Sequence, residues 1–109
     1  MKVKTFETKY GQKPIDEFIK MQDQQTISKI AFRIDLLEQF GPRLGMPYSK
    51  KITAGLHELR IRGKVDIRVL YAFRNNQALL LHIFKKKQDK IPKKEIKIAE
   101  GRLSQVDLT

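Results

Sequence analysis

Two arginines, Arg60 and Arg68, lie in consecutive segments whose alternation of apolar and polar residues is typical of β-strands. The segments span residues 56–62 and 67–73. If residues 63–65 form the turn between them, Arg60 lies directly opposite Arg68. Like charges in that position destabilise a sheet unless an anion lies between them, supplied by a ligand or by a nearby carboxylate. The spacing therefore predicts an anion-binding site on one face of the sheet.

Two carboxylates accompany these arginines and offer a simpler explanation of the same pattern. Side chains alternate between the two faces of a strand, so Glu58, Arg60 and Arg62 share one face. The same turn pairs Arg62 with Asp66. In this alternative, Glu58 and Asp66 neutralise the arginines as ordinary surface ion pairs, each worth about 0–1 kcal/mol, and no ligand is required.

A phosphate held by the arginines would make metal-free cleavage of RNA possible. The 2′-hydroxyl of the substrate can attack the phosphorus, so the protein needs no nucleophile of its own. It needs cations that stabilise the charge of the phosphorane and groups that transfer protons. The candidate cations are Arg60, Arg68, Lys85 and Lys86, and the candidate bases are Glu58 and His57.

The remaining side chains do not favour another chemistry. There is no cysteine, and no cluster of histidines and carboxylates has the spacing of a metal site, so we expect neither a metal nor a cofactor. The six glycines are scattered over turns and form no phosphate-binding motif. His57 is in phase with Leu59, and His82 is in phase with Leu80 and Phe84, so both histidines also fit structural positions.

The net charge of +11 is concentrated in the second half of the chain. Residues 50–109 hold 15 of the 23 lysines and arginines but only 6 of the 12 acidic residues. This asymmetry indicates a polyanionic partner, either nucleic acid or an acidic protein segment. With no cysteine, no signal sequence and no apolar span, we expect a soluble cytoplasmic protein that contacts no membrane.

The first half of the chain predicts one strand and two helices. Residues 2–7 fit a strand, although their alternation is imperfect. Pro14 suits the first turn of a helix and precedes an apolar stripe of helical spacing. A second helix begins near Asp23 or Thr26 and ends where glycine and proline follow one another at residues 41–42. Residues 42–54 are predicted to form a loop.

The second half predicts three strands and a final helix. A strand at residues 78–84 follows the two that carry the arginines, and a basic helix follows Pro92. The order β-α-α-β-β-β-α indicates an α+β fold in a single domain, residues 1–109. We expect an antiparallel sheet with an N-terminal helix hairpin packed on one face and a short C-terminal helix.

Several short runs of this sequence together resemble the RelE/ParE toxin superfamily, and most closely its HigB-type, phage-related branch. The runs are residues 55–60 (GLHELR), 68–71 (RVLY), 81–86 (LHIFKK) and 91–92 (IP), followed by Ala99. The resemblance covers nearly the whole chain and implies a RelE-like fold. It also implies the toxin of a type II toxin–antitoxin pair, which acts as a messenger-RNA endonuclease on the ribosome and inhibits translation.

The resemblance implies roles for particular residues and partners. Arg60 and Arg68 match the strand arginines of such toxins, and Lys85 and Lys86 match the basic pair at the end of the last strand. The expected partners are messenger RNA on the ribosome and a cognate antitoxin, typically a HigA-like helix-turn-helix protein. Further contacts with RNA are expected from basic and aromatic residues around the strands: Lys50, Lys51, Arg62, Lys86, Lys87 and Tyr48.

Two departures from the family pattern concern proton transfer and base stacking. RelE-like enzymes have a lysine where this chain has Glu58. They also have a C-terminal tyrosine that stacks on a base, whereas the last tyrosine here is Tyr71. Tyr48 or His57 is the candidate substitute. Two other functions stay open at this point: a ParE-like inhibitor of DNA gyrase, and a non-catalytic module that binds RNA or the ribosome.

Overall fold

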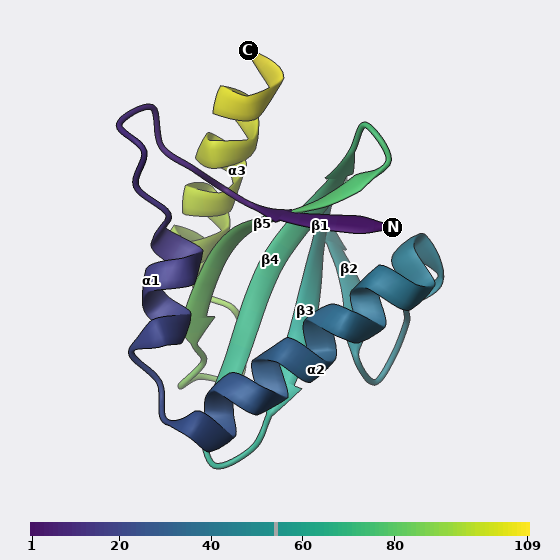
Figure 1. The fold of residues 1–109 in the computed structure, drawn as a ribbon, viewed down its shortest axis with the longest axis vertical. Helices are drawn as coiled ribbons and strands as arrows, with labels where there is room; N and C mark the ends of the chain where they lie inside the picture. Colours follow the sequence, from purple (N-terminus) through teal and green to yellow (C-terminus); the bar gives the residue numbers. More distant parts are fainter. Residues whose placement is uncertain (54) are drawn as a thin grey trace.

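A five-stranded sheet lies between two layers of helix in the computed structural model, which describes residues 1–53 and 55–109 (Figure 1). The strands are β1 Lys2–Thr5, β2 Ser49–Thr53, β3 Leu56–Arg62, β4 Asp66–Arg74 and β5 Gln77–Lys85. The helices are α1 Pro14–Lys20, α2 Gln24–Phe40 and α3 Lys93–Asp107, with a 3-10 turn, η1, at Gly41–Arg43. The α+β class predicted from the sequence is confirmed.

The sheet has the strand order β1-β5-β4-β3-β2. The neighbours from β2 to β5 are antiparallel, as predicted, but β1 pairs with β5 in parallel, from Lys2 opposite Gln77 to Thr5 opposite Leu80. The expectation of a wholly antiparallel sheet is therefore wrong at this edge. A parallel neighbour requires a long connection, which α1, α2 and the following strands provide.

The loop predicted for residues 42–54 is also wrong in part. It contains most of η1 and the whole of β2, which pairs with β3 from Ser49 opposite Leu59 to Thr53 opposite Leu56. The last residue of that predicted loop, Ala54, lies outside the described residues. A short, lysine-rich strand at the edge of a sheet has little apolar alternation, because one side of its backbone faces solvent.

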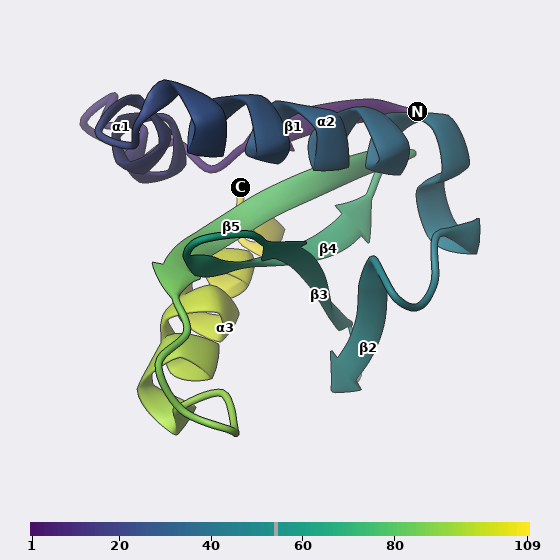
Figure 2. The same cartoon turned by 90° about the horizontal axis from the view of Figure 1, so that it is seen from below.

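The helices α1 and α2 cover one face of the sheet. The side chain of Asp23 accepts a hydrogen bond from the Thr26 backbone N–H at 2.8 Å and caps α2, which ends where Gly41 adopts a φ of 51°. Both limits agree with the prediction. The two helices do not run antiparallel, however, since Figure 2 shows α1 nearly end-on while α2 extends across the picture.

The turns between the central strands fix which residues face one another. The turn at residues 63–65 leaves Arg62 opposite Asp66 and Arg60 opposite Arg68, so the register predicted from the sequence is confirmed. Asn75 and Asn76, with φ values of 53° and 59°, form the two-residue turn that joins β4 to β5.

The third helix, α3, packs on the face of the sheet opposite α1 and α2 (Figure 2). Ala99 is fully buried there, and His82 of β5 contacts Glu95 of α3. On the other face, Leu59, Ile61 and Val69 are buried with residues of the two N-terminal helices. Among the described residues, no helix is long and apolar enough to cross a membrane.

Candidate functional site

A cluster of charged side chains lies on the α3 face of β3 and β4. Glu58 divides its two carboxylate oxygens between the arginines: Oε1 accepts from Arg60 Nε at 2.8 Å, and Oε2 accepts from Arg68 Nη1 at 2.9 Å. The anion between the two opposed arginines is therefore a carboxylate of the chain itself. Glu58 is only 2% exposed, so this is a buried ion cluster and not the surface pairing considered above.

Arg68 is fully enclosed by its partners. Its side chain is 1% exposed, and the carboxylate of Asp66 accepts from Nε at 2.9 Å and from Nη2 at 3.0 Å. Burial opposes the charge, but the hydrogen bonds and charges of Asp66 and Glu58 outweigh it and raise the pKa of Arg68. Every nitrogen of this guanidinium is engaged, so Arg68 supports the site from within.

Arg60 differs from Arg68 because the two terminal nitrogens of its guanidinium are available to a ligand. Its Nε donates to Glu58, and no hydrogen bond joins its two terminal nitrogens to another residue in the described ranges. The side chain is 15% exposed. A guanidinium held at Nε with its terminal fork free can bind two oxygens of a phosphate at once.

Arg60 lines a hollow of about 310 Å³ between the sheet and the start of α3. We call it the arginine hollow. It contains five cations, two carboxylates and an apolar wall of isoleucines, contributed by Lys50, Lys51, Ile52, Glu58, Arg60, Lys86, Asp89, Lys90, Ile91 and Ile96. This lining suits a ligand that carries negative charge beside an apolar ring, as a nucleotide does.

The structure separates the lysines predicted at the end of β5. Lys86 lines the arginine hollow, and its backbone N–H donates to the Asp66 carbonyl at 2.7 Å. Lys85 is exposed opposite Ile67, so its strand position belongs to the other face. Lys87 is exposed and is not part of the lining. Of these neighbouring lysines at the end of β5, only Lys86 lines the arginine hollow.

The two histidines lie outside the arginine hollow. His57 is opposite Tyr71 on the α1–α2 face and stacks on its ring at 5.2 Å, so it does not join Glu58 as a base. Burial and the charge of Lys51 lower the pKa of His57. His82 lies beneath α3, where its Nε2 is 3.0 Å from Glu95 Oε1. Its position is structural, as its phase with Phe84 suggested.

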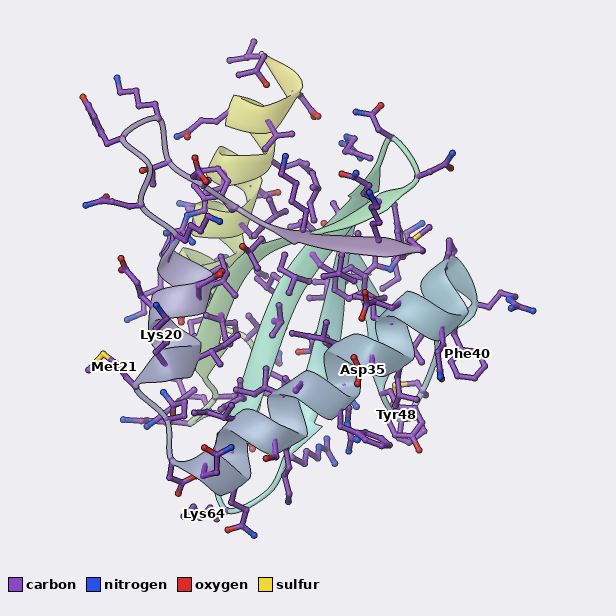
Figure 3. All side chains as sticks on the ribbon, viewed as in Figure 1. Lys20, Met21, Asp35, Phe40, Tyr48 and Lys64 are labelled. Atoms are coloured by element: carbon purple, nitrogen blue, oxygen red, sulfur yellow. The ribbon has the colours of Figure 1, made fainter. Side chains whose placement is uncertain are left out.

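Two other residues predicted to bind RNA lie on the α2 side. The Arg33 guanidinium lies over the ring of Tyr48 at 4.9 Å, and Figure 3 shows Tyr48 near the C-terminal half of α2. Arg62 borders a second hollow with residues of α2. Sequence reasoning missed Arg33, whose contacts join segments far apart in the chain, and it missed Asp89, Lys90 and the isoleucines of the arginine hollow.

Comparison with family models assigns the chain to one family. A model described as phage-derived protein Gp49-like matches residues 17–104, well over half of the sequence. The chain belongs to this Gp49-like family. The family is toxin-like and related to RelE- and HigB-type toxins, in agreement with the resemblance seen in the sequence. No match was found among curated proteins.

The matched region of the Gp49-like chain includes every residue of the arginine hollow. It also includes α2, so both sides of β3 described above belong to the family region. Within residues 1–53 and 55–109, no three histidines or carboxylates gather as metal ligands.

Proposed function

We propose that this Gp49-like chain is the toxin of a type II toxin–antitoxin pair and an endoribonuclease that cuts messenger RNA on the ribosome. One observation carries the proposal: the terminal nitrogens of Arg60 make no hydrogen bond to the described residues, and Arg60 lines a hollow together with Lys50, Lys86 and Lys90. Membership of a toxin-like family supports it. A cluster of fixed cations is what the charge of a phosphorane requires.

The proposed reaction uses the RNA as its own nucleophile. The 2′-oxygen forms a bond to the adjacent phosphorus, and the bond from phosphorus to the 5′-oxygen breaks. One proton leaves the 2′-hydroxyl and one reaches the departing 5′-oxygen. The products are a 2′,3′-cyclic phosphate and a 5′-hydroxyl, and the fork of Arg60 stabilises the two non-bridging oxygens in between.

Two groups of the arginine hollow are suited to these proton transfers. Glu58 is a carboxylate within hydrogen-bond distance of Arg60, so it lies beside any phosphate that Arg60 binds and accepts the proton of the 2′-hydroxyl. Lys86 lines the same space, so its side chain donates the proton to the 5′-oxygen. Glu58 thus has two roles, since it also holds both arginines in place.

The proposed antitoxin inhibits by covering the same cations. The arginine hollow contains five cations and two carboxylates, and a segment of acidic side chains would pair with the excess. A HigA-like helix-turn-helix protein with such a segment is the expected partner. A complex in which the antitoxin contacts only α1 and α2 would argue against this steric form of inhibition.

The test is inducible expression in a bacterial host, followed by growth measurement and mapping of RNA ends. The wild-type chain should arrest growth and produce messenger RNA fragments with 5′-hydroxyl ends. Arg60→Ala should reduce cleavage about 100-fold or more, because it removes the phosphate fork. Arg60→Lys should recover little, because an ammonium lacks the planar fork. Arg43→Ala, an exposed arginine of η1 outside the hollow, is the control.

Three results would contradict the proposal. An Arg60→Ala chain that folds and still cleaves at the wild-type rate would remove the site assignment. DNA-damage signalling without loss of messenger RNA would favour inhibition of DNA gyrase. Binding of RNA without cleavage on translating ribosomes would indicate a non-catalytic module.

A further inference from the structure

A second cluster of aromatic and basic side chains lies on the opposite side of β3, against α2. The Arg33 guanidinium lies over two rings, at 5.8 Å from the centre of Phe32 and 4.9 Å from the centre of Tyr48. Phe32 is 57% exposed and Tyr48 is 37% exposed. Exposed aromatic rings in contact with a cation are a kind of surface that unpaired nucleic acid binds.

This cluster borders a hollow of about 460 Å³ whose lining carries no negative charge. Lys29, Arg33 and Arg62 supply three cations, Gln25 and Ser28 supply neutral polar groups, and Phe32 supplies the apolar surface. The arginine hollow differs, since Glu58 and Asp89 offset part of its charge. A ligand here meets uncompensated positive charge beside an exposed ring.

We propose that the α2 platform, made of Phe32, Arg33 and Tyr48 with Lys29 and Arg62 beside it, binds single-stranded RNA. A base stacks on the exposed ring of Phe32, and the neighbouring phosphates lie against Lys29 and Arg62. Aromatic rings alternating with cations are the usual means of holding unpaired nucleic acid, because every base has a flat face. The choice of RNA rests on the proposed function.

The backbone of Arg60 connects the platform to the arginine hollow. Arg33 Nε donates to the Arg60 carbonyl at 3.3 Å, and the Arg60 N–H donates to the Tyr48 carbonyl at 2.8 Å. The residue whose side chain faces one hollow is therefore fixed by main-chain contacts to the other cluster. RNA bound at both places would be held at the phosphate that Arg60 contacts and at one further point, the platform.

An acidic protein segment is a poorer fit to this surface than RNA. Carboxylates would pair with Lys29 and Arg62, but they would gain nothing from the exposed face of Phe32. The Arg33 guanidinium already lies against two rings and donates to the Arg60 carbonyl, which commits part of its hydrogen-bonding capacity. Stacking and charge together favour a ligand with both bases and phosphates.

The experiment measures binding of a fluorescein-labelled 12-nucleotide 2′-O-methyl RNA by fluorescence anisotropy. This RNA lacks the 2′-hydroxyl, so it binds without being cut. Phe32→Ala should raise the dissociation constant about 10-fold, the loss expected for one stacked base. Lys29→Gln should reduce the slope of log affinity against log salt concentration by about one, the change expected when one phosphate contact is lost. Tyr10→Ala is the matched control, an aromatic residue 80% exposed beside Lys9 but far from α2 in sequence.

Phe32→Leu separates stacking from general apolar contact. The proposal predicts that Phe32→Leu loses most of the RNA affinity that Phe32→Ala loses, because leucine has no flat face. Equal affinity of Phe32→Ala and wild type for the RNA would overturn the proposal, and so would full recovery by Phe32→Leu. The proposal would also be overturned, in favour of a protein partner, if Phe32→Ala lost binding to a polyglutamate peptide while its affinity for the RNA was unchanged.

This inference and the proposed function fail in different ways. A wild-type chain that binds the RNA through Phe32 but cuts nothing would leave the platform in place and remove the nuclease. If the wild-type chain cuts RNA and the Phe32→Ala variant binds the 2′-O-methyl RNA with the wild-type dissociation constant, the nuclease is retained and the platform is contradicted. Thermal unfolding of each variant establishes that a change in binding is not a loss of fold.

Discussion

The two faces of the central strands are both buried, but they are buried by different means. On the α1–α2 face, Leu59, Ile61 and Val69 are at most 2% exposed and lose only apolar surface from water. On the α3 face, Glu58 and Arg68 are equally buried, and each is tolerated because the other completes its hydrogen bonds. Burial by itself therefore does not distinguish the apolar core from the charged site. The charged side chains differ from the core because their burial depends on complete hydrogen bonding between them.

The largest effect is expected from breaking the pairing on the charged face. Arg68→Ala leaves Glu58 and Asp66 without the guanidinium that joins them, and removal of one member of a buried ion pair costs about 3–5 kcal/mol. Urea unfolding should show that loss. A triple variant with Arg68→Met, Glu58→Gln and Asp66→Asn should recover much of the lost free energy of unfolding. A loss below about 1 kcal/mol in Arg68→Ala would mean that the cluster is well hydrated.

Truncation on the apolar face should cost somewhat less. Leu59 is fully buried, and Leu59→Ala removes apolar contacts and leaves a cavity, at about 3 kcal/mol. The same unfolding measurement applies. Cleavage measured per folded molecule should persist, since Leu59 does not line the arginine hollow. Loss of cleavage in a chain that remains folded would show that the two faces are coupled.

A smaller effect is expected from pH, because each face holds one histidine. Burial lowers the pKa of His57, with a further contribution from Lys51, and burial lowers the pKa of His82 although Glu95 opposes it. The unfolded chain therefore binds protons at a higher pH than the folded one. The free energy of unfolding should be highest above about pH 6.5 and fall as the pH drops below that value.

Replacement of both histidines checks this assignment. In a His57→Gln, His82→Gln chain, the fall between pH 6.5 and 5 should become shallower in a series of urea titrations. An unchanged slope in the double variant would assign the pH dependence to other groups. The single variants would then show how much each face contributes.

The smallest effect is expected at an exposed copy of the buried arrangement. Arg74 donates to Asp107 through Nε at 2.9 Å and Nη2 at 3.2 Å, nearly the same geometry as Arg68 with Asp66. Both side chains are more than one-third exposed, so Arg74→Ala should cost less than about 1 kcal/mol. High salt should reduce that cost further. A loss as large as that of Arg68→Ala would show that geometry, not burial, sets the strength of these pairs.

The features that depend on local chemistry could be predicted from the sequence. Glycine and proline end α2, two asparagines form the turn between β4 and β5, and the turn at residues 63–65 places Arg60 opposite Arg68. Strand alternation separates Lys85 from Lys86, although the sequence reasoning treated them as a pair. Alternation did not place Arg62, however, which shares the phase of Arg60 but borders the hollow on α2 at the end of its strand.

The features that depend on distant segments could not be predicted. The strand β2 has no apolar alternation, and its pairing with β3 is a tertiary event. Nothing near Arg33 in the sequence indicates that it contacts the Arg60 carbonyl, 27 residues away. The sequence offered Glu58 as a surface partner of the arginines, but its burial and the division of its two oxygens between Arg60 and Arg68 depend on the fold.

The parallel pair at the sheet edge has a consequence for synthesis of the chain. Residues 2–5 are synthesised before the other strands, but their partners are residues 77–80, which belong to the last strand to be made. The N-terminal segment must therefore wait through the synthesis of α1, α2 and four strands before it can bind. The cell makes both arginines of the site before the sheet that holds them can close.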